Sequence, residues 1–96
     1  MVEKLSGRER EQSLRDLKGW VYDEAAGAIE RAFKFKDFSE AFAFISRVAL
    51  AAEKAGHHPD WSNSYGSVTI RLSTHDAGGL SARDIALAKA IDAILA

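Results

Sequence analysis

Two of the three histidines in this 96-residue chain are adjacent, at His57 and His58, and the only proline, Pro59, follows them. Proline fixes its own φ angle and disfavours the helical region for the residue before it, so we expect both imidazoles on a stiff connector. Imidazole titrates near neutral pH, and a held pair can therefore offer one protonated and one neutral ring nitrogen. This segment therefore carries the donor and acceptor groups that proton transfer requires.

The third histidine, His75, is expected to lie close to that pair. Residues 61–65 and 67–74 predict two strands of a hairpin, because the second alternates apolar and polar side chains and the two are separated by a glycine. A hairpin returns the chain to the end at which it began, so segments 57–61 and 73–76 should be neighbours. Three imidazoles could then converge.

Three interpretations of this histidine cluster are open from the residues. Three imidazoles with an open position form a known catalytic zinc arrangement, but adjacent His57 and His58 are awkward as two ligands of one ion. The chain also lacks the helical His-x-x-x-His spacing, which disfavours a metal site. The histidines could instead be structural, hydrogen-bonded at a surface turn. A metal-free site is the third interpretation, with one imidazole accepting a proton while another donates one.

The elements that must position these side chains follow from capping residues and periodicity. Capping boxes at Ser6 and Ser81 predict a helix to about residue 18 and a last helix from about residue 82. Residues 20–22 and 28–35 predict a first hairpin. Between the hairpins, residues 38–54 contain no glycine or proline and predict the central helix. Its expected buried face comprises Phe38, Phe42, Ile45, Ala49 and Ala52, widened by Phe44, Val48 and Ala51.

This pattern predicts an α+β fold with the order α-β-β-α-β-β-α. Two hairpins separated by a helix imply a four-stranded antiparallel sheet with three helices packed on one face. An edge strand such as 68–72, or the opposite face of the sheet, would then need to be covered or polar, which makes self-association plausible.

Composition narrows the function classes. The length predicts one domain, residues 1–96. With 13 basic and 14 acidic residues and a net charge of -1, we expect no direct nucleic-acid binding and no membrane partner. The chain has no cysteine, which excludes thiolate chemistry and suits a reducing cytosol. No long apolar run suggests a signal or a membrane span, so a cytoplasmic location is the default expectation.

The chain also closely resembles the pterin-4a-carbinolamine dehydratases over about four fifths of its length. The resemblance is carried by Gly19-Trp20, Phe35-Lys36-Asp37-Phe38, Arg47-Val48-Ala49-Leu50, Glu53-Lys54, His57-His58-Pro59-Asp60-Trp61, Tyr65, Leu72-Ser73-Thr74-His75-Asp76, Gly79-Leu80-Ser81 and Arg83-Asp84. It implies a dehydratase without cofactor or metal, acting on 4a-hydroxytetrahydropterin and yielding quinonoid dihydropterin. Loss of water needs a proton donor and a proton acceptor beside a flat heterocycle, and imidazoles can serve as both.

The same resemblance implies residue roles. His57 and His75 resemble the family's acid/base histidines, and His58 resembles its substrate-contacting histidine. Glu53 matches a carboxylate near the site, whose role from the helical spacing would be to orient His57. The expected substrate-binding residues are Glu53, Trp61, Ser73, Thr74 and Asp76. For Trp20 we expect a core position, and for Asp84 a helix-capping role.

The implied partners are the pterin substrate, other copies of the chain in a homodimer or homotetramer, and an aromatic amino acid hydroxylase. Some members of the family also act as dimerisation cofactors of a transcription factor, which gives an alternative function as a protein-interaction module. Its candidate surface would be the last helix, with Ile85, Ile91 and Leu95. The same residues have the spacing of a core-facing stripe, and we favour that interpretation.

Overall fold

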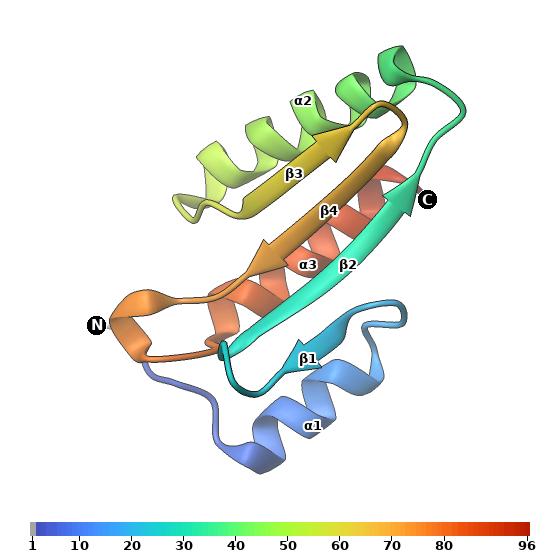
Figure 1. Ribbon diagram of the computed structural model, residues 1–96. Helices are drawn as coiled ribbons and strands as arrows, with labels where there is room; N and C mark the ends of the chain where they lie inside the picture. Colours follow the sequence, from blue (N-terminus) through green and yellow to red (C-terminus); the bar gives the residue numbers. More distant parts are fainter. Residues whose placement is uncertain (1) are drawn as a thin grey trace.

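The computed structural model describes residues 2–96 and confirms the predicted order of elements, α-β-β-α-β-β-α (Figure 1). A short 3₁₀ turn at His75–Ala77 precedes the last helix. The other elements are α1 (Gly7–Arg15), β1 (Val21–Asp23), β2 (Ala28–Lys34), α2 (Phe38–Ala55), β3 (Asp60–Ser64), β4 (Ser67–Leu72) and α3 (Ala82–Ile94). Among these described residues, no helix is both long and apolar enough to cross a membrane.

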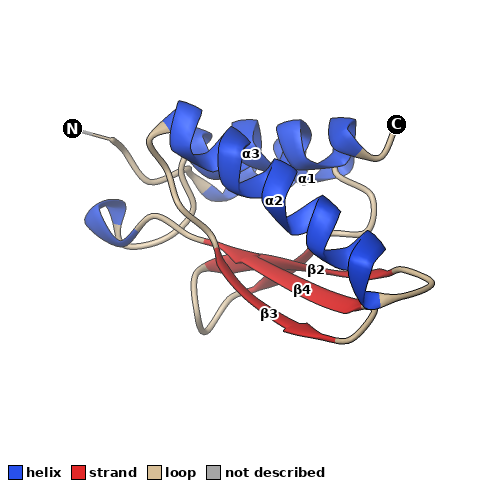
Figure 2. Ribbon diagram, turned by 90° about the horizontal axis from the view of Figure 1, so that it is seen from above, coloured by secondary structure: helices blue, strands red, loops and turns tan. Residues whose placement is uncertain are grey.

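The four strands form one antiparallel sheet in the order β1-β2-β4-β3, and the helices cover one face of it (Figure 2). Strand β4 therefore lies inside the sheet, between β2 and β3, and the suggestion that residues 68–72 form an edge is wrong. The long β2–β4 pairing, from Ile29 opposite Leu72 to Lys34 opposite Ser67, joins the two hairpins. The edges are β1 and β3.

The core lies between the sheet and the helices. Alternate residues of β4, namely Val68, Ile70 and Leu72, are buried, while the intervening ones are only partly covered. From α3, Ile85 and Ile91 are also buried, which confirms the core-facing stripe on that helix. Trp20 is buried as expected, and its indole N–H donates to the Asp92 carboxylate at 3.0 and 3.1 Å.

The predicted buried face of α2 is confirmed for Phe44, Val48 and Ala52 and wrong for Phe38, Phe42 and Ala49, so the buried stripe is rotated from the expected centre. Its buried residues are Ala41, Phe44, Val48 and Ala52, whereas Phe38, Phe42 and Ala49 are exposed. Both stripes have helical spacing and both are apolar, so periodicity could not choose between them. The contact with β2 decides, because the Phe44 ring packs on Phe33 with 4.8 Å between ring centroids.

The first helix begins at a capping box, as predicted, but ends at Arg15 rather than near residue 18. The Ser6 backbone N–H donates to the Glu9 carboxylate, and the Glu9 N–H donates to the Ser6 hydroxyl oxygen. Hydrogen bonding to the Glu9 carboxylate, first from the Ser6 backbone N–H and then from the Ser6 side chain, lowers the pKa of Glu9 below its ordinary value of 4.5. The ionised carboxylate therefore stabilises the helix terminus above about pH 4.5, and this contribution fades as the pH falls through the lowered pKa.

We predict that removing the Ser6 hydroxyl raises the titration midpoint of Glu9. In Ser6→Ala the side-chain contribution to the lowered pKa is lost, so the midpoint should move toward 4.5 but stay below it while the backbone bond survives. Carboxyl NMR shifts across pH 2–7 measure this directly. Ser13→Ala, the same change later on the same helix, serves as the control and should leave the Glu9 midpoint unchanged. An unchanged Glu9 midpoint would contradict the capping geometry.

Candidate active site

The C-terminus of α2 sets the position of the first histidine. Gly56 adopts a left-handed conformation, with φ of 66°, and closes the helix. This conformation favours glycine because it has no side chain to clash. The next residue, His57, donates its backbone N–H to the Ala52 carbonyl at 3.2 Å, so the chain leaves the helix on a fixed path.

The hairpin formed by β3 and β4 brings the third histidine to the same place. The loop after α2 and the turn after β4 lie at one end of this hairpin (Figure 1). A cavity of about 280 Å³ opens there. It is lined by Gly56, His57, His58, Ser73, Thr74, His75, Asp76 and Arg83. The expectation that the segments carrying all three histidines are neighbours is therefore confirmed.

His57 is held by a buried carboxylate from α3. Its Nε2 lies 2.5 Å from Asp84 Oδ1, and the Asp84 side chain is fully buried while that of His57 is 11% exposed. The other carboxylate oxygen of Asp84 accepts the Thr74 hydroxyl at 2.8 Å and the Ser81 backbone N–H at 3.0 Å. His57 is thus the most rigidly placed of the three imidazoles.

Glu53 contacts His58 rather than His57, which corrects the contact expected from helical spacing. Glu53 Oε1 lies 2.9 Å from His58 Nε2. Both side chains are largely exposed, at 80% and 66%, so solvent weakens this pair. The physical reason for the change is that the helix ends at Gly56, after which His57 turns inward toward Asp84 and His58 stays outside.

The expected substrate-binding residues fall into two groups. Ser73, Thr74 and Asp76 line the histidine cavity. Trp61 does not; it lies on the edge strand β3, opposite Ile70, with 40% of its surface exposed. Glu53 is also not among the cavity residues and reaches the site only through His58.

Asp84 is the site residue whose second role sequence reasoning missed. Its predicted capping role is confirmed, since the capping box with Ser81 is present. The box uses only one oxygen of the carboxylate, and the other oxygen contacts His57. Nothing in the local sequence signals this second contact, because it joins residues 27 positions apart that only the packing of α3 beside the end of α2 brings together.

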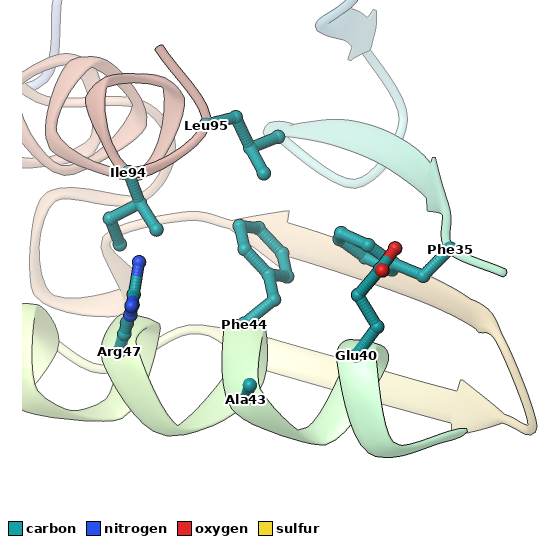
Figure 3. Close-up of a pocket in the computed structure, with 7 residues that line it drawn as sticks. All are labelled: Phe35, Glu40, Ala43, Phe44, Arg47, Ile94 and Leu95. Carbon is teal, nitrogen blue, oxygen red and sulfur yellow. The ribbon is translucent and has the colours of Figure 1, made fainter. Parts of the chain in front are cut away.

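A second cavity, of about 240 Å³, lies between α2 and the end of α3 (Figure 3). The side chains of Phe35 and Phe44 point into the space beneath Ile94 and Leu95, with Glu40 and Arg47 at its sides. No histidine lines it, whereas all three candidate proton-transfer residues line the histidine cavity. Within residues 2–96, no group of three or more His, Asp or Glu side chains is placed to hold a metal ion.

Known proteins resemble the chain over nearly its full length. The sequence model of the family described as pterin 4 alpha carbinolamine dehydratase matches residues 3–94. A protein of Rhodopseudomonas palustris (strain HaA2), provisionally named a pterin-4-alpha-carbinolamine dehydratase, is 57% identical over 98% of this chain and 93% of its own. A protein of Rhodospirillum rubrum with the same provisional name is 56% identical over 99% of each chain.

Two solved structures share the fold. A transcriptional coactivator/pterin dehydratase from Brucella melitensis has a TM-score of 0.92 and 44% identity, covering 96% of this chain and 98% of its own. A pterin dehydratase-like protein identified as a RuBisCO assembly factor in the alpha-carboxysome has a TM-score of 0.68 at 23% identity, over 79% of this chain and 88% of its own, and shows the fold alone. From the family match and the identities, the chain belongs to the pterin carbinolamine dehydratase family.

Proposed function

We propose that the protein dehydrates 4a-hydroxytetrahydropterin to quinonoid dihydropterin by acid/base catalysis through His57, His58 and His75. The observation that carries this proposal is the single cavity lined by all three imidazoles, one of them fixed by a buried aspartate. Membership of the family and the dehydratase names of the relatives support the substrate class.

The reaction needs two proton movements. The C4a hydroxyl gains a proton and leaves as water while its C–O bond breaks, and N5 loses its proton as the C4a–N5 double bond forms. One imidazolium can donate the first proton and one neutral imidazole can accept the second, so no net proton is consumed. His57 and His75 are the proposed donor and acceptor, in either assignment, and the exposed His58 contacts the substrate and assists transfer.

The remaining expected substrate contacts form part of the same proposal. Ser73 and Asp76 line the cavity and can hydrogen-bond the amide and amino edge of the pterin. Thr74 lies in the same wall. Glu53 orients His58 from outside, and Trp61 would reach a bound ring only from the neighbouring edge strand. In a cell, the reaction would follow an aromatic amino acid hydroxylase in tetrahydrobiopterin recycling.

The direct test is the dehydration rate of freshly generated 4a-hydroxytetrahydropterin with the wild-type protein and EDTA present. We expect an acceleration over the spontaneous reaction that EDTA leaves unchanged. An acceleration abolished by EDTA would instead indicate metal-dependent chemistry. If correctly folded protein gives no acceleration, the dehydratase proposal fails, and a binding function becomes the better hypothesis.

We also propose self-association as a homodimer or homotetramer. Three large apolar side chains of α2 are exposed, Phe38, Phe42 and Leu50, and every residue of the edge strand β3 is exposed. Multi-angle light scattering of the purified protein tests this. A monomer mass at high protein concentration would contradict it.

The alternative function, dimerisation cofactor of a transcription factor, has in its favour the coactivator name of the Brucella melitensis protein. The surface expected for this function cannot contact a partner, because Ile85 and Ile91 are buried in the core and, of the three residues, only Leu95 is exposed. A partner would therefore need another face of the molecule. We favour the enzymatic function.

A further inference from the structure

Three almost completely buried polar side chains lie behind His57. Thr74 is 4% exposed, and Ser81 and Asp84 are fully buried. Buried polar groups are costly unless each finds a partner, and every buried side-chain nitrogen and oxygen in residues 2–96 has one. A fully satisfied network of this kind holds its members in one arrangement.

Counting protons fixes the direction of the hydrogen bonds. A carboxylate only accepts, so the Thr74 hydroxyl donates its single proton to Asp84 Oδ2 at 2.8 Å. The Thr74 oxygen must then accept from the Ser81 hydroxyl, which lies 2.7 Å away. The Ser81 hydroxyl oxygen in turn accepts the Arg83 backbone N–H at 3.2 Å. The result is a one-way chain from Ser81 through Thr74 to Asp84.

These hydrogen bonds determine which oxygen of Asp84 is left to accept a hydrogen bond from His57. Oδ2 already accepts two donors, the Thr74 hydroxyl and the Ser81 backbone N–H, and Oδ1 faces His57 Nε2. A carboxylate that accepts two donors at Oδ2 offers only lone pairs at Oδ1, so the group at Nε2 must be a donor. In neutral His57 the proton therefore sits on Nε2, and Nδ1 carries the lone pair.

The lone-pair nitrogen is the one that can reach a substrate. Within residues 2–96, Asp84 is the side-chain partner found for His57, and no buried side-chain nitrogen lacks a partner. Nδ1 is consequently open to solvent, and His57 lines the cavity. We propose that Thr74 and Ser81 are positioning residues, whose hydroxyl chain locks Asp84 so that His57 keeps its proton on Nε2 and presents Nδ1 to the substrate. The last step rests on the proposed function; the tautomer does not.

The tautomer is measured on the wild-type protein without substrate. Nitrogen-15 NMR of the histidine ring, recorded in mildly alkaline solution where an imidazole is neutral, distinguishes a protonated from an unprotonated ring nitrogen. We expect protonated Nε2 and unprotonated Nδ1. The opposite tautomer, or an even mixture, would overturn the proposal whether or not the protein is a dehydratase.

Isosteric variants test the hydroxyl chain. Thr74→Val removes the hydroxyl and keeps the shape, while Thr74→Ser keeps the hydroxyl. We expect Thr74→Val to populate both His57 tautomers and to lower kcat by about tenfold or more with little change in KM, as losses of orienting partners generally do. Thr74→Ser should restore both properties. Thr69→Val, the same change on β4 outside this cavity, is the matched control and should behave as wild type.

The possible outcomes separate this inference from the proposed function. A Thr74→Val protein with raised KM but unchanged kcat and tautomer would make Thr74 a substrate contact and overturn the positioning role. A wild type with the expected tautomer but no dehydratase activity would sink the proposed function and leave the hydroxyl chain standing. If Thr74→Val does not fold, Ser81→Ala removes the donor to Thr74 instead and should likewise mix the tautomers and lower kcat, and a Ser81→Ala protein with wild-type tautomer and kcat would overturn the positioning role.

Discussion

The His75→Ala variant is expected to lose about a hundredfold or more of the dehydration rate, the usual loss when a general acid or base is removed, while its thermal stability stays near that of wild type. His75 is exposed and, within residues 2–96, makes no side-chain hydrogen bond, so the fold does not depend on it. Its imidazole nevertheless lines the cavity beside His57 and His58. The substitution should therefore lower the dehydration rate without lowering the melting temperature.

The exposed Lys89 on the outer side of α3 supplies the control, and Lys89→Ala should change neither quantity. A His75→Ala protein that keeps its full rate would remove His75 from the acid/base pair and leave the chemistry to His57 and His58. If the rate fell only in proportion to the amount of folded protein lost, the proposed catalytic role of His75 would also be contradicted.

His57 should behave differently because it is tied to a buried charge. His57→Ala leaves Asp84 Oδ1 without its donor, so this variant is expected to lose stability as well as rate. His57→Gln provides the sharper comparison, because its amide can still donate a hydrogen bond but cannot transfer protons. We expect glutamine to recover part of the stability and none of the rate. Recovery of the rate as well would show that His57 only fills space.

Phe44→Ala is the second variant with a large expected effect, a loss of about 3–5 kcal/mol in the free energy of unfolding. The Phe44 side chain is 4% exposed, and its ring contacts those of Phe33 and Phe35 with centroid distances of 4.8 and 5.0 Å. Truncation would leave a cavity between α2 and the sheet that the neighbouring rings cannot fill. Urea or thermal unfolding followed by circular dichroism measures the loss.

Phe42→Ala is the matched comparison, because it makes the same change two positions away on the same helix. Phe42 is 56% exposed, so its truncation should change the unfolding free energy of the single chain by about 1 kcal/mol or less. A loss that depends on protein concentration would report an interface between copies. A concentration-independent loss as large as that of Phe44→Ala would instead show that Phe42 is buried within the single chain, as periodicity predicted.

Local sequence was sufficient for the elements and for their order. Ser6 and Ser81 cap their helices as expected, and Asp37 caps α2 in the same way, since each bonds a backbone N–H group only a few residues away. Alternation in residues 67–74 predicted a strand with one buried face, which the structure places at Ser67–Leu72. The hairpin that follows from this strand placed His75 beside the His57–His58 pair. These features depend on neighbours in the chain, so the chain encodes them directly.

Choices between equivalent alternatives were left to the tertiary structure. Both stripes of α2 are apolar, and only the phenylalanines of β2 and its extension select Phe44 over Phe42 as the buried residue. The sequence suggested a carboxylate partner for His57 but named Glu53, one helical turn away. The actual partner is Asp84 from α3, because the helix ends at Gly56 and the imidazole turns toward the core. Contacts between residues distant in sequence depend on how whole elements pack, and no local pattern records that.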